Sequence, residues 1–288
     1  MKLDSAWLDL LPTDADVAFY REHGYYVSPQ IFTDEEVDDA VYGSERFYAG
    51  ERDFSLPPSV RPFEGWKPED GDGPRINDYV SLQNREISAL VFHPLVGAIA
   101  ARLAGTPTIR LWHDQMIYKT VDKSRRRSGI GWHTDRAYWQ TCTSTEMLTA
   151  WIPFQDCDES LGPLTVVDGS HLWAGHDRLR GFHSSDLDAW EKEFATSGKP
   201  VRKVPMTLKK GQVSFHHCQA IHGSAANVGD AVRHSISVHL QDDANRYRRV
   251  VDDKGEVIWH RNDILCRARD GQPDYTDPDF CPVLWTEE

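Results

Sequence analysis

The segment GQVSFHHCQAIHGSAANVGDAVRHSISVHL, residues 211–240, decides the fold of this chain. Apolar and polar side chains alternate through its second half, which predicts a β-strand with two different environments. One face carries Val232, His234, Ile236, Val238 and Leu240, and the other carries Arg233, Ser235, Ser237 and His239. A row of arginine and serine suits a polar cavity. The alternative is a solvated face on an outer sheet.

A candidate metal motif precedes this segment at His133-Thr134-Asp135. Residues i and i+2 of an extended segment point to the same face, so His133 and Asp135 can reach one ion while Thr134 points away. His222 is then the third ligand, from a strand distant in sequence but adjacent in space, as in an antiparallel barrel or jelly roll. Two histidines and a carboxylate form the facial triad that holds non-haem Fe(II) with open coordination positions.

Arg233 follows His222 closely, and its guanidinium can grip a carboxylate of an organic co-substrate with two parallel hydrogen bonds. An isolated His-x-Asp triplet arises easily by chance, so the motif depends on this context. His216 and His217 lie close to His222 and are alternative ligands on sequence grounds alone.

The chain resembles the phytanoyl-CoA dioxygenase family of Fe(II)/2-oxoglutarate oxygenases from about Asp16 to about Leu240. Besides the metal motif, the resemblance is carried by Phe19–Val27, Phe32–Val37, Phe92–Val96, Leu103–Pro107, Trp112–Lys119, Gly162–Leu164 and Asp168–His171. Asp168 stands where the family pattern usually has proline. Each piece is weak alone, but the combination is specific.

The resemblance implies a mainly β fold: a double-stranded β-helix (jelly-roll, cupin-like) core with N-terminal and inserted α-helices. It implies Fe(II) on His133, Asp135 and His222, with 2-oxoglutarate as co-substrate and O2 as oxidant. It favours His222 over its neighbours, because the Gly-Ser after it and the downstream arginine fit the family pattern.

Further residues are candidates for the same site. The co-substrate candidates are Arg233 for the far carboxylate, Ser235 on the same strand face, Lys119, and Trp151, which is alternatively an ordinary core tryptophan. The candidates for substrate binding are Thr134, Arg136, Tyr138, Trp139, Phe63 and Trp66. His171 is expected to be structural and Cys218 to be a packing residue, and no role is assigned to His113, His176, His183, His234 or His239.

We expect one domain over residues 1–288. It comprises a mainly helical part (1–107), a jelly-roll core (108–240) and a C-terminal extension packed on the barrel (241–288). Helices are expected at 14–24, 33–49 and 85–104, with a helical insertion at 186–200, and Thr33 and Glu36 form a capping-box pattern. Residues 51–78 are rich in Pro, Gly and charge with aromatic residues between, which favours a lid over a disordered segment.

Composition narrows the partners. The formal net charge of −13 argues against general nucleic-acid binding, which relies on basic surface. The basic cluster 123–127 is either a solvated loop or a rim that attracts an anionic substrate. We expect no apolar run to reach the roughly 20 residues that span a bilayer, and the N-terminus lacks a signal-peptide pattern. We therefore expect a cytoplasmic protein whose five cysteines are free thiols, and the sequence does not define its oligomeric state.

The function expected from these residues is an Fe(II)/2-oxoglutarate-dependent dioxygenase that hydroxylates a small metabolite. One alternative keeps the scaffold but catalyses desaturation, cyclisation or epimerisation in secondary metabolism. Another is a cupin-like metal-binding protein that does not use 2-oxoglutarate. Asp135 argues against halogenation, because halogenases that resemble the family replace this carboxylate with a small residue.

Overall fold

The computed structural model describes residues 3–63, 65–125, 128–175, 179–184, 191–192, 199 and 201–287, without the side chains of 61–63. Two antiparallel sheets form the core. The larger sheet has the order β1 (Tyr25–Val27), β8 (Ser214–His217), β5 (Leu148–Pro153), β10 (Arg233–Asp242), β3 (Thr108–Lys119) and β15 (Val283–Thr286), and β2 (Arg75–Asp78) also pairs with β3. The smaller sheet has the order β4 (Ile130–His133), β9 (His222–Ser224), β6 (Leu164–Val167) and β7 (Lys203–Pro205). The jelly-roll fold class predicted from the sequence is confirmed.

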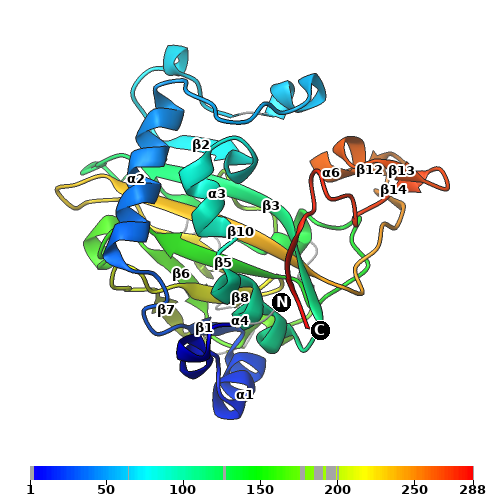
Figure 1. Ribbon diagram of the computed structural model, residues 1–288, viewed down its shortest axis with the longest axis horizontal. Coiled ribbons are helices and arrows are strands. Elements are labelled where there is room, and N and C mark those ends of the chain that lie inside the picture. Colours follow the sequence, from blue (N-terminus) through cyan, green and yellow to red (C-terminus); the bar gives the residue numbers. More distant parts are fainter. Residues whose placement is uncertain are drawn as a thin grey trace.

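The alternation of β10 separates two environments as predicted. Ile236, Val238 and Leu240 are fully buried in the main hydrophobic core, on the helical side of the larger sheet. Figure 1 shows the helices α2 (Asp34–Tyr48), α3 (Arg85–Val91) and α4 (Pro94–Ala104) in front of this sheet. Arg233, Ser237 and His239 on the opposite face of β10 line a cavity. One face of this strand therefore packs in the core, and the other contributes to the candidate site.

The N-terminal helices follow the predicted pattern with one difference. α1 (Asp14–His23) ends at Gly24, and α2 begins after Thr33, whose side chain and that of Glu36 form the expected capping box. The helix expected at 85–104 is divided into α3 and α4, because Pro94 disfavours helical backbone in the residue before it.

The stretch Arg85–Ala104 also corrects the expectation about apolar runs. Its length of 20 residues, with a mean hydropathy of 1.7 over an 18-residue window, would suit a membrane span by composition. However, 61% of that window is buried inside the domain, and a core helix meets the same criterion. We assign it to the core because the larger sheet packs against it.

One segment differs from expectation, and the structure adds detail to another. The C-terminal part of the predicted lid is β2, so residues 75–78 belong to the sheet and the lid hypothesis is restricted to what precedes them. The C-terminal extension adds β15 to the edge of β3 and includes α6 (Arg261–Leu265). It also holds two small hairpins, β11 (Val250–Val251) with β12 (Val257–Ile258), and β13 (Ala268–Arg269) with β14 (Gln272–Pro273). Most of the helical insertion expected at 186–200 lies outside the described residues.

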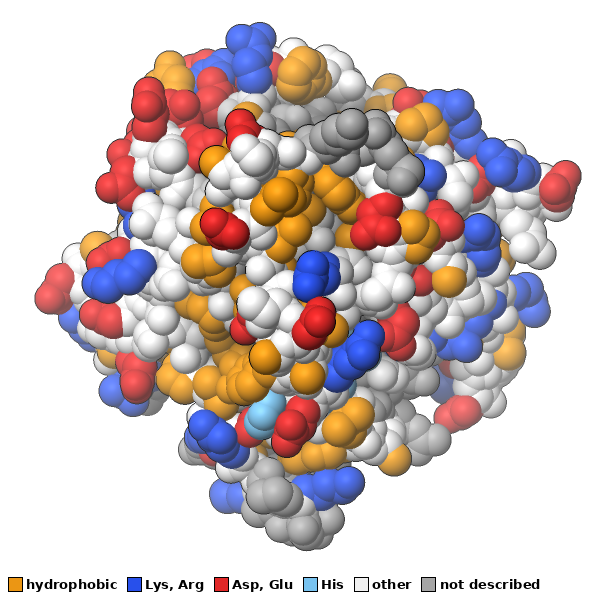
Figure 2. Space-filling model, turned by 60° about the horizontal axis from the view of Figure 1, so that its bottom comes forward, with side chains coloured by type: hydrophobic (Ala, Val, Ile, Leu, Met, Phe, Trp, Pro, Cys, Tyr) orange, Lys and Arg blue, Asp and Glu red, His pale blue; other side chains and the backbone are white. Residues whose placement is uncertain are grey.

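The cysteines agree with the expectation from composition. All five cysteines are buried and unbridged, and Cys218 packs in a hydrophobic cluster as expected. In the basic cluster, Lys123 forms an ion pair with Asp230 at 2.8 Å, and residues 126 and 127 lie outside the described part. Figure 2 shows acidic and basic side chains intermixed over one face of the molecule, with hydrophobic side chains between them.

Loss of the α2 cap should destabilise the domain. Thr33 Oγ1 accepts a hydrogen bond from the Glu36 backbone N–H at 3.2 Å, and the Thr33 N–H donates to Glu36 Oε2 at 2.8 Å. We predict that Thr33→Ala lowers the free energy of unfolding by about 0.5–2 kcal/mol in urea titrations. Thr33→Ser, which keeps the hydroxyl, should stay close to wild type. Equal stability of the alanine and serine variants would contradict this role for the cap.

Candidate metal centre and active site

Three side chains that can hold a metal ion meet between the two sheets. His133 at the end of β4 pairs directly with His222 at the start of β9, and Asp135 follows two residues after His133. One potential ligand atom from each residue lies within 4.8 Å of the others. Asp135 Oδ1 is 3.9 Å from His133 Nε2 and 3.7 Å from His222 Nε2. The grouping predicted from the sequence is therefore brought together by the fold.

Backbone carbonyls fix how the two histidines present themselves. His133 Nδ1 lies 2.8 Å from the Gly131 carbonyl oxygen, and His222 Nδ1 lies 3.0 Å from that of Ala220. A carbonyl only accepts, so each Nδ1 carries the proton and each Nε2 offers its lone pair. Such orientation by an outer hydrogen bond is typical of metal-binding histidines.

The protonation states also suit a cation. Burial lowers the pKa of His133 and holds that of His222 well below its ordinary value, so both rings are neutral. Burial alone would raise the pKa of Asp135, but the surrounding imidazoles, His222 first, outweigh it and hold the pKa well below the ordinary value. Metal ligands must be deprotonated in this way before an ion binds.

Two cations lie beside this group without an anionic partner. Arg233 on β10 and Lys119 on β3 are register partners, and both are almost completely buried. Arg233 donates to the Gly162 carbonyl and lies over the Trp151 ring at 5.5 Å. Lys119 donates to Ser224 Oγ at 2.6 Å and to the Ala225 carbonyl at 2.7 Å. Among the described residues, neither forms an ion pair with a carboxylate.

Burial disfavours the charged form of both side chains. Burial lowers the pKa of Arg233 to about 10. Burial, reinforced by repulsion from Arg233, holds the pKa of Lys119 well below its ordinary value. Unpaired buried cations are costly, so this end of the site is suited to receive an anion.

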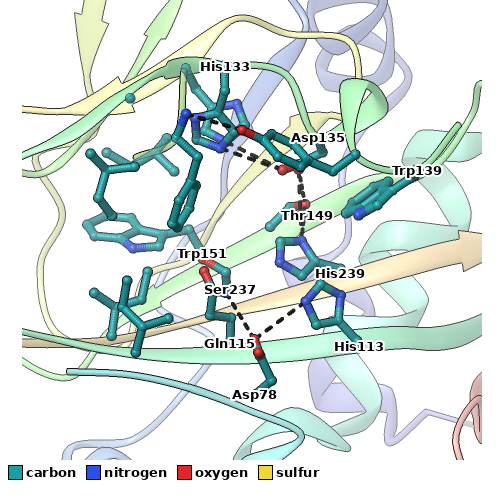
Figure 3. A pocket seen from close by; sticks show the side chains of 18 of the residues that line it. Asp78, His113, Gln115, His133, Asp135, Trp139, Thr149, Trp151, Ser237 and His239 are labelled. Atoms are coloured by element: carbon teal, nitrogen blue, oxygen red, sulfur yellow. Dashed lines mark hydrogen bonds and ion pairs between the residues drawn. The ribbon is translucent and has the colours of Figure 1, made fainter. Parts of the chain in front are cut away.

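A cavity of about 530 Å³ contains the metal group. Both sheets line it: the larger through β2, β3, β5, β8 and β10, and the smaller through β4, β6 and β9. Figure 3 shows His133 and Asp135 at one end and Asp78 and His113 at the other, with Thr149 and His239 between them. The cavity therefore extends well beyond the metal group and has room for an organic molecule.

The far end of the cavity is polar and partly built by the C-terminal extension. Asp78 is ion-paired with Arg261 and accepts a hydrogen bond from Gln115 Nε2 at 2.9 Å. Trp259 and His260, which precede α6, line the same end. Burial lowers the pKa of His113 to about 4 and holds that of His260 well below its ordinary value, so these rings are neutral there.

Several predicted site residues lie where the sequence placed them. Tyr138, Trp139, Trp151 and Arg233 line the cavity. Ser235, two residues after Arg233, is fully buried and does not line the cavity, and its hydroxyl has no hydrogen-bond partner among the described residues. His216 lines the cavity near Asp135, whereas His217 packs against Tyr20 and His171 away from it. Among the described residues, the group whose ligand atoms all lie within 4.8 Å of one another contains His222 and neither His216 nor His217, which favours His222 as the ligand.

Other predicted substrate contacts need correction. Thr134 caps the short 3-10 helix Asp135–Ala137, and Arg136 is buried with its guanidinium on the carbonyls of Trp139 and Ser144, because the chain turns directly after the metal motif. Trp66 packs on Tyr48 and Arg75 on the helical side of the larger sheet. None of these three lines the cavity. The side chain of Phe63 lies outside the described part of the chain.

The structure also adds residues that the sequence did not single out. His113 and His239, which were given no role, line the cavity together with Thr149, Asp78 and Gln115. The alternation of β3 carried a usable signal, because His113, Gln115 and Lys119 share one face. Trp259, His260 and Arg261 gave no such signal, since they follow the last recognisable strand.

Comparison with known proteins identifies relatives over most of the chain. The family model described as "Phytanoyl-CoA dioxygenase (PhyH)" matches residues 20–235. The peroxisomal phytanoyl-CoA dioxygenase of Bos taurus is 24% identical over 93% of this chain and 79% of that enzyme. The crystal structure of the non-haem α-ketoglutarate-dependent carbocyclase SnoK from nogalamycin biosynthesis is similar with a TM-score of 0.68 and 26% identity, covering 94% of this chain and 96% of SnoK. The epimerase SnoN, in complex with Fe3+, α-ketoglutarate and nogalamycin RO, has a TM-score of 0.67 and 24% identity, covering 98% of this chain and 100% of SnoN.

The metal assignment makes a direct prediction. His133→Ala or His222→Ala should abolish detectable Fe(II) binding in anaerobic calorimetry, because two remaining protein ligands do not define the coordination face. His217→Ala is the matched control, since this neighbouring histidine lies outside the cavity, and it should bind iron like the wild type. Normal binding by His222→Ala together with loss in His217→Ala would reverse the assignment.

Proposed function

Because the chain belongs to the phytanoyl-CoA dioxygenase family, we propose that it uses Fe(II), 2-oxoglutarate and O2 to oxidise a small organic molecule, most simply by hydroxylation. It is a non-haem Fe(II)- and 2-oxoglutarate-dependent dioxygenase by family. The roles of individual residues and the reaction outcome are the proposal.

The residues present fit both groups that the family implies. His133, Asp135 and His222 would hold the metal, since their lone pairs converge from two strands and a turn. Arg233 would hold the far carboxylate of 2-oxoglutarate. When bound together, iron and 2-oxoglutarate activate O2 for attack on an unreactive C–H bond. The protein orients the reactants and excludes water from the buried end of the cavity.

One observation carries the assignment of 2-oxoglutarate: the buried, unpaired cations Arg233 and Lys119. A cation without a carboxylate in a protein interior costs several kcal/mol, so its retention points to an anionic ligand. Arg233 lines the cavity, whereas Lys119 donates to Ser224, which does line it. We therefore assign Arg233 to direct contact with the co-substrate and Lys119 to support through Ser224.

Oxidative cyclisation is a second candidate outcome, favoured by the likeness to the carbocyclase SnoK over nearly the full length of both chains. Halogenation is disfavoured, because the carboxylate of Asp135 lies in the metal group. A halide would have to take the coordination position that this carboxylate would occupy.

The substrate is a small molecule that fits between the aromatic wall of Tyr138 and Trp139 and the polar end at Asp78 and Arg261. Charge at the polar end is balanced by the Asp78–Arg261 pair, and the neighbouring imidazoles are neutral. This favours an uncharged part of the substrate, with hydroxyl or carbonyl groups, at that end. Cytoplasmic localisation stays a prediction, since the bovine relative is named as peroxisomal.

The function is tested by two measurements on the purified protein. Anaerobic addition of Fe(II) and then 2-oxoglutarate should produce the weak visible absorption band of the chelate. In air, a screen of metabolites should find compounds that stimulate succinate release and gain an oxygen atom or a ring by mass spectrometry. Iron binding without a chelate band would instead support a cupin-like metal protein that does not use 2-oxoglutarate.

Arg233→Leu should weaken 2-oxoglutarate binding much more than iron binding. It removes a charge-assisted pair to a buried carboxylate, which is worth about 2–5 kcal/mol when one partner is truncated. Arg233→Lys keeps the charge but not the two-pronged geometry, and should lose less. The affinities follow from titrating the chelate band at saturating iron, and an unchanged affinity in Arg233→Leu would exclude this role.

A further inference from the structure

We propose that Thr149 and His239 are positioning residues that hold Asp135 as a metal ligand through one oxygen only. The inference rests on the proposed function, because it takes Asp135 to be a ligand of the metal. It concerns residues that do not themselves belong to the ligand group.

The two oxygens of Asp135 face different surroundings. Oδ1 points toward the histidine ligands, at 3.9 Å from His133 Nε2 and 3.7 Å from His222 Nε2. Oδ2 is hydrogen-bonded to Thr149 Oγ1 at 2.6 Å. One oxygen is therefore directed at the metal position, and the other is held by a neighbouring strand.

The direction of each hydrogen bond follows from the groups involved. An ionised carboxylate only accepts, so the single hydroxyl hydrogen of Thr149 is donated to Asp135. Thr149 can then only accept from His239 Nδ1, which lies 2.8 Å from the same Oγ1. His239 must carry its proton on Nδ1, and the order of donation runs from His239 through Thr149 to Asp135.

The His239 ring is itself held in place. It stacks on His113 with ring centroids 4.3 Å apart and an angle of 26° between the planes, and the edge of Trp139 packs against it at 5.0 Å. His113 Nε2 lies 3.8 Å from Asp78, which Gln115 and Arg261 hold from the other side. Figure 3 shows this row of side chains running from Asp78 to Asp135 along the cavity.

His216 is the other group near Oδ2, with its Nε2 at 3.5 Å. That separation is at the limit of a hydrogen bond, and neither ring nitrogen of His216 has a hydrogen-bond partner among the described residues. The Thr149 hydroxyl is much closer and makes the short contact. We therefore assign the hold on Oδ2 to Thr149.

The hydrogen bond from Thr149 to Asp135 Oδ2 affects how many coordination positions the carboxylate occupies. A carboxylate that turns both oxygens toward a metal takes one more coordination position than a carboxylate bound through one oxygen. The facial triad is useful because it leaves positions open for the co-substrate and O2. With Oδ2 fixed by Thr149, Asp135 leaves those positions free and keeps one orientation before any ion arrives.

The test measures the metal alone, before any turnover. Loss of an outer-shell partner typically costs 10–100-fold in metal affinity, so Thr149→Val should lower Fe(II) affinity by about that factor in anaerobic calorimetry. Thr149→Ser keeps the hydroxyl and should stay within roughly threefold of wild type. The visible spectrum of the Co(II)-loaded protein, which reports the coordination of the ion, should change in Thr149→Val and not in Thr149→Ser.

The matched control is Thr165→Val on β6, the strand next to β9. It makes the same change, but among the described residues Thr165 Oγ1 hydrogen-bonds only to the Pro163 carbonyl, at 3.5 Å. It should leave metal affinity and the Co(II) spectrum unchanged. Equal losses in Thr165→Val and Thr149→Val would reveal a general packing effect and overturn the proposal.

His239 gives a second arm that decides the matter if Thr149→Val does not fold, as judged by circular dichroism. His239→Asn can donate from Nδ2 in place of the ring Nδ1 and should retain metal affinity, whereas His239→Leu should lose affinity and alter the Co(II) spectrum. Wild-type affinity and spectrum in His239→Leu would then overturn the proposal, as would wild-type affinity and spectrum in a folded Thr149→Val. A wild-type protein that fails to bind Fe(II) would instead defeat the proposed function.

Discussion

The site depends on the antiparallel pairing of β4 with β9, in which His133 and His222 stand directly opposite each other. Opposed residues of such a pair have their Cβ atoms roughly 5 Å apart, which lets two imidazoles converge on one ion. A shift of one residue would send either ring to the other face of the sheet. The short helical turn after Thr134 then brings Asp135 back toward the pair. Ligand geometry is therefore a consequence of strand register.

The larger sheet forms the opposite wall of the cavity and contains two buried cationic side chains. Lys119 and Arg233 are neighbours across β3 and β10, so two cations share a buried place without a carboxylate. Such an arrangement is unfavourable for folding by itself. Hydrogen bonds from both side chains to backbone carbonyls reduce the penalty without cancelling the charge. The apolar side of the same strands offsets it, because Ile236, Val238 and Leu240 are fully buried against the helices.

The features that follow from local periodicity and capping patterns could be predicted from the sequence. Alternation in β10 predicted both its faces, and the capping box predicted the start of α2. The His-x-Asp triplet indicated a metal, but choosing His222 over His216 needed the resemblance or the register with β4. The alternation of β10 placed His239 on the face of Arg233, but its contact through Thr149 with Asp135 gave no signal, because it joins β5 and β10 to a turn far away in the chain. Trp66 was placed wrongly because it packs on Tyr48 and Arg75 on the helical side of the larger sheet, and Arg136 because the chain turns directly after the metal motif.

The two ends of the cavity are built by different parts of the chain, and similarity to the family covers only one of these parts fully. The metal end is made by strands inside the matched region 20–235. The far end includes Trp259, His260 and Arg261, which lie beyond that region in the C-terminal extension. Asp78 on β2 links the two, because it pairs with Arg261 and lies within 3.8 Å of His113, whose ring stacks on His239. The chemistry of the metal end can therefore stay constant while the extension changes, and substrate choice should be sought in residues 259–261 rather than among the ligands.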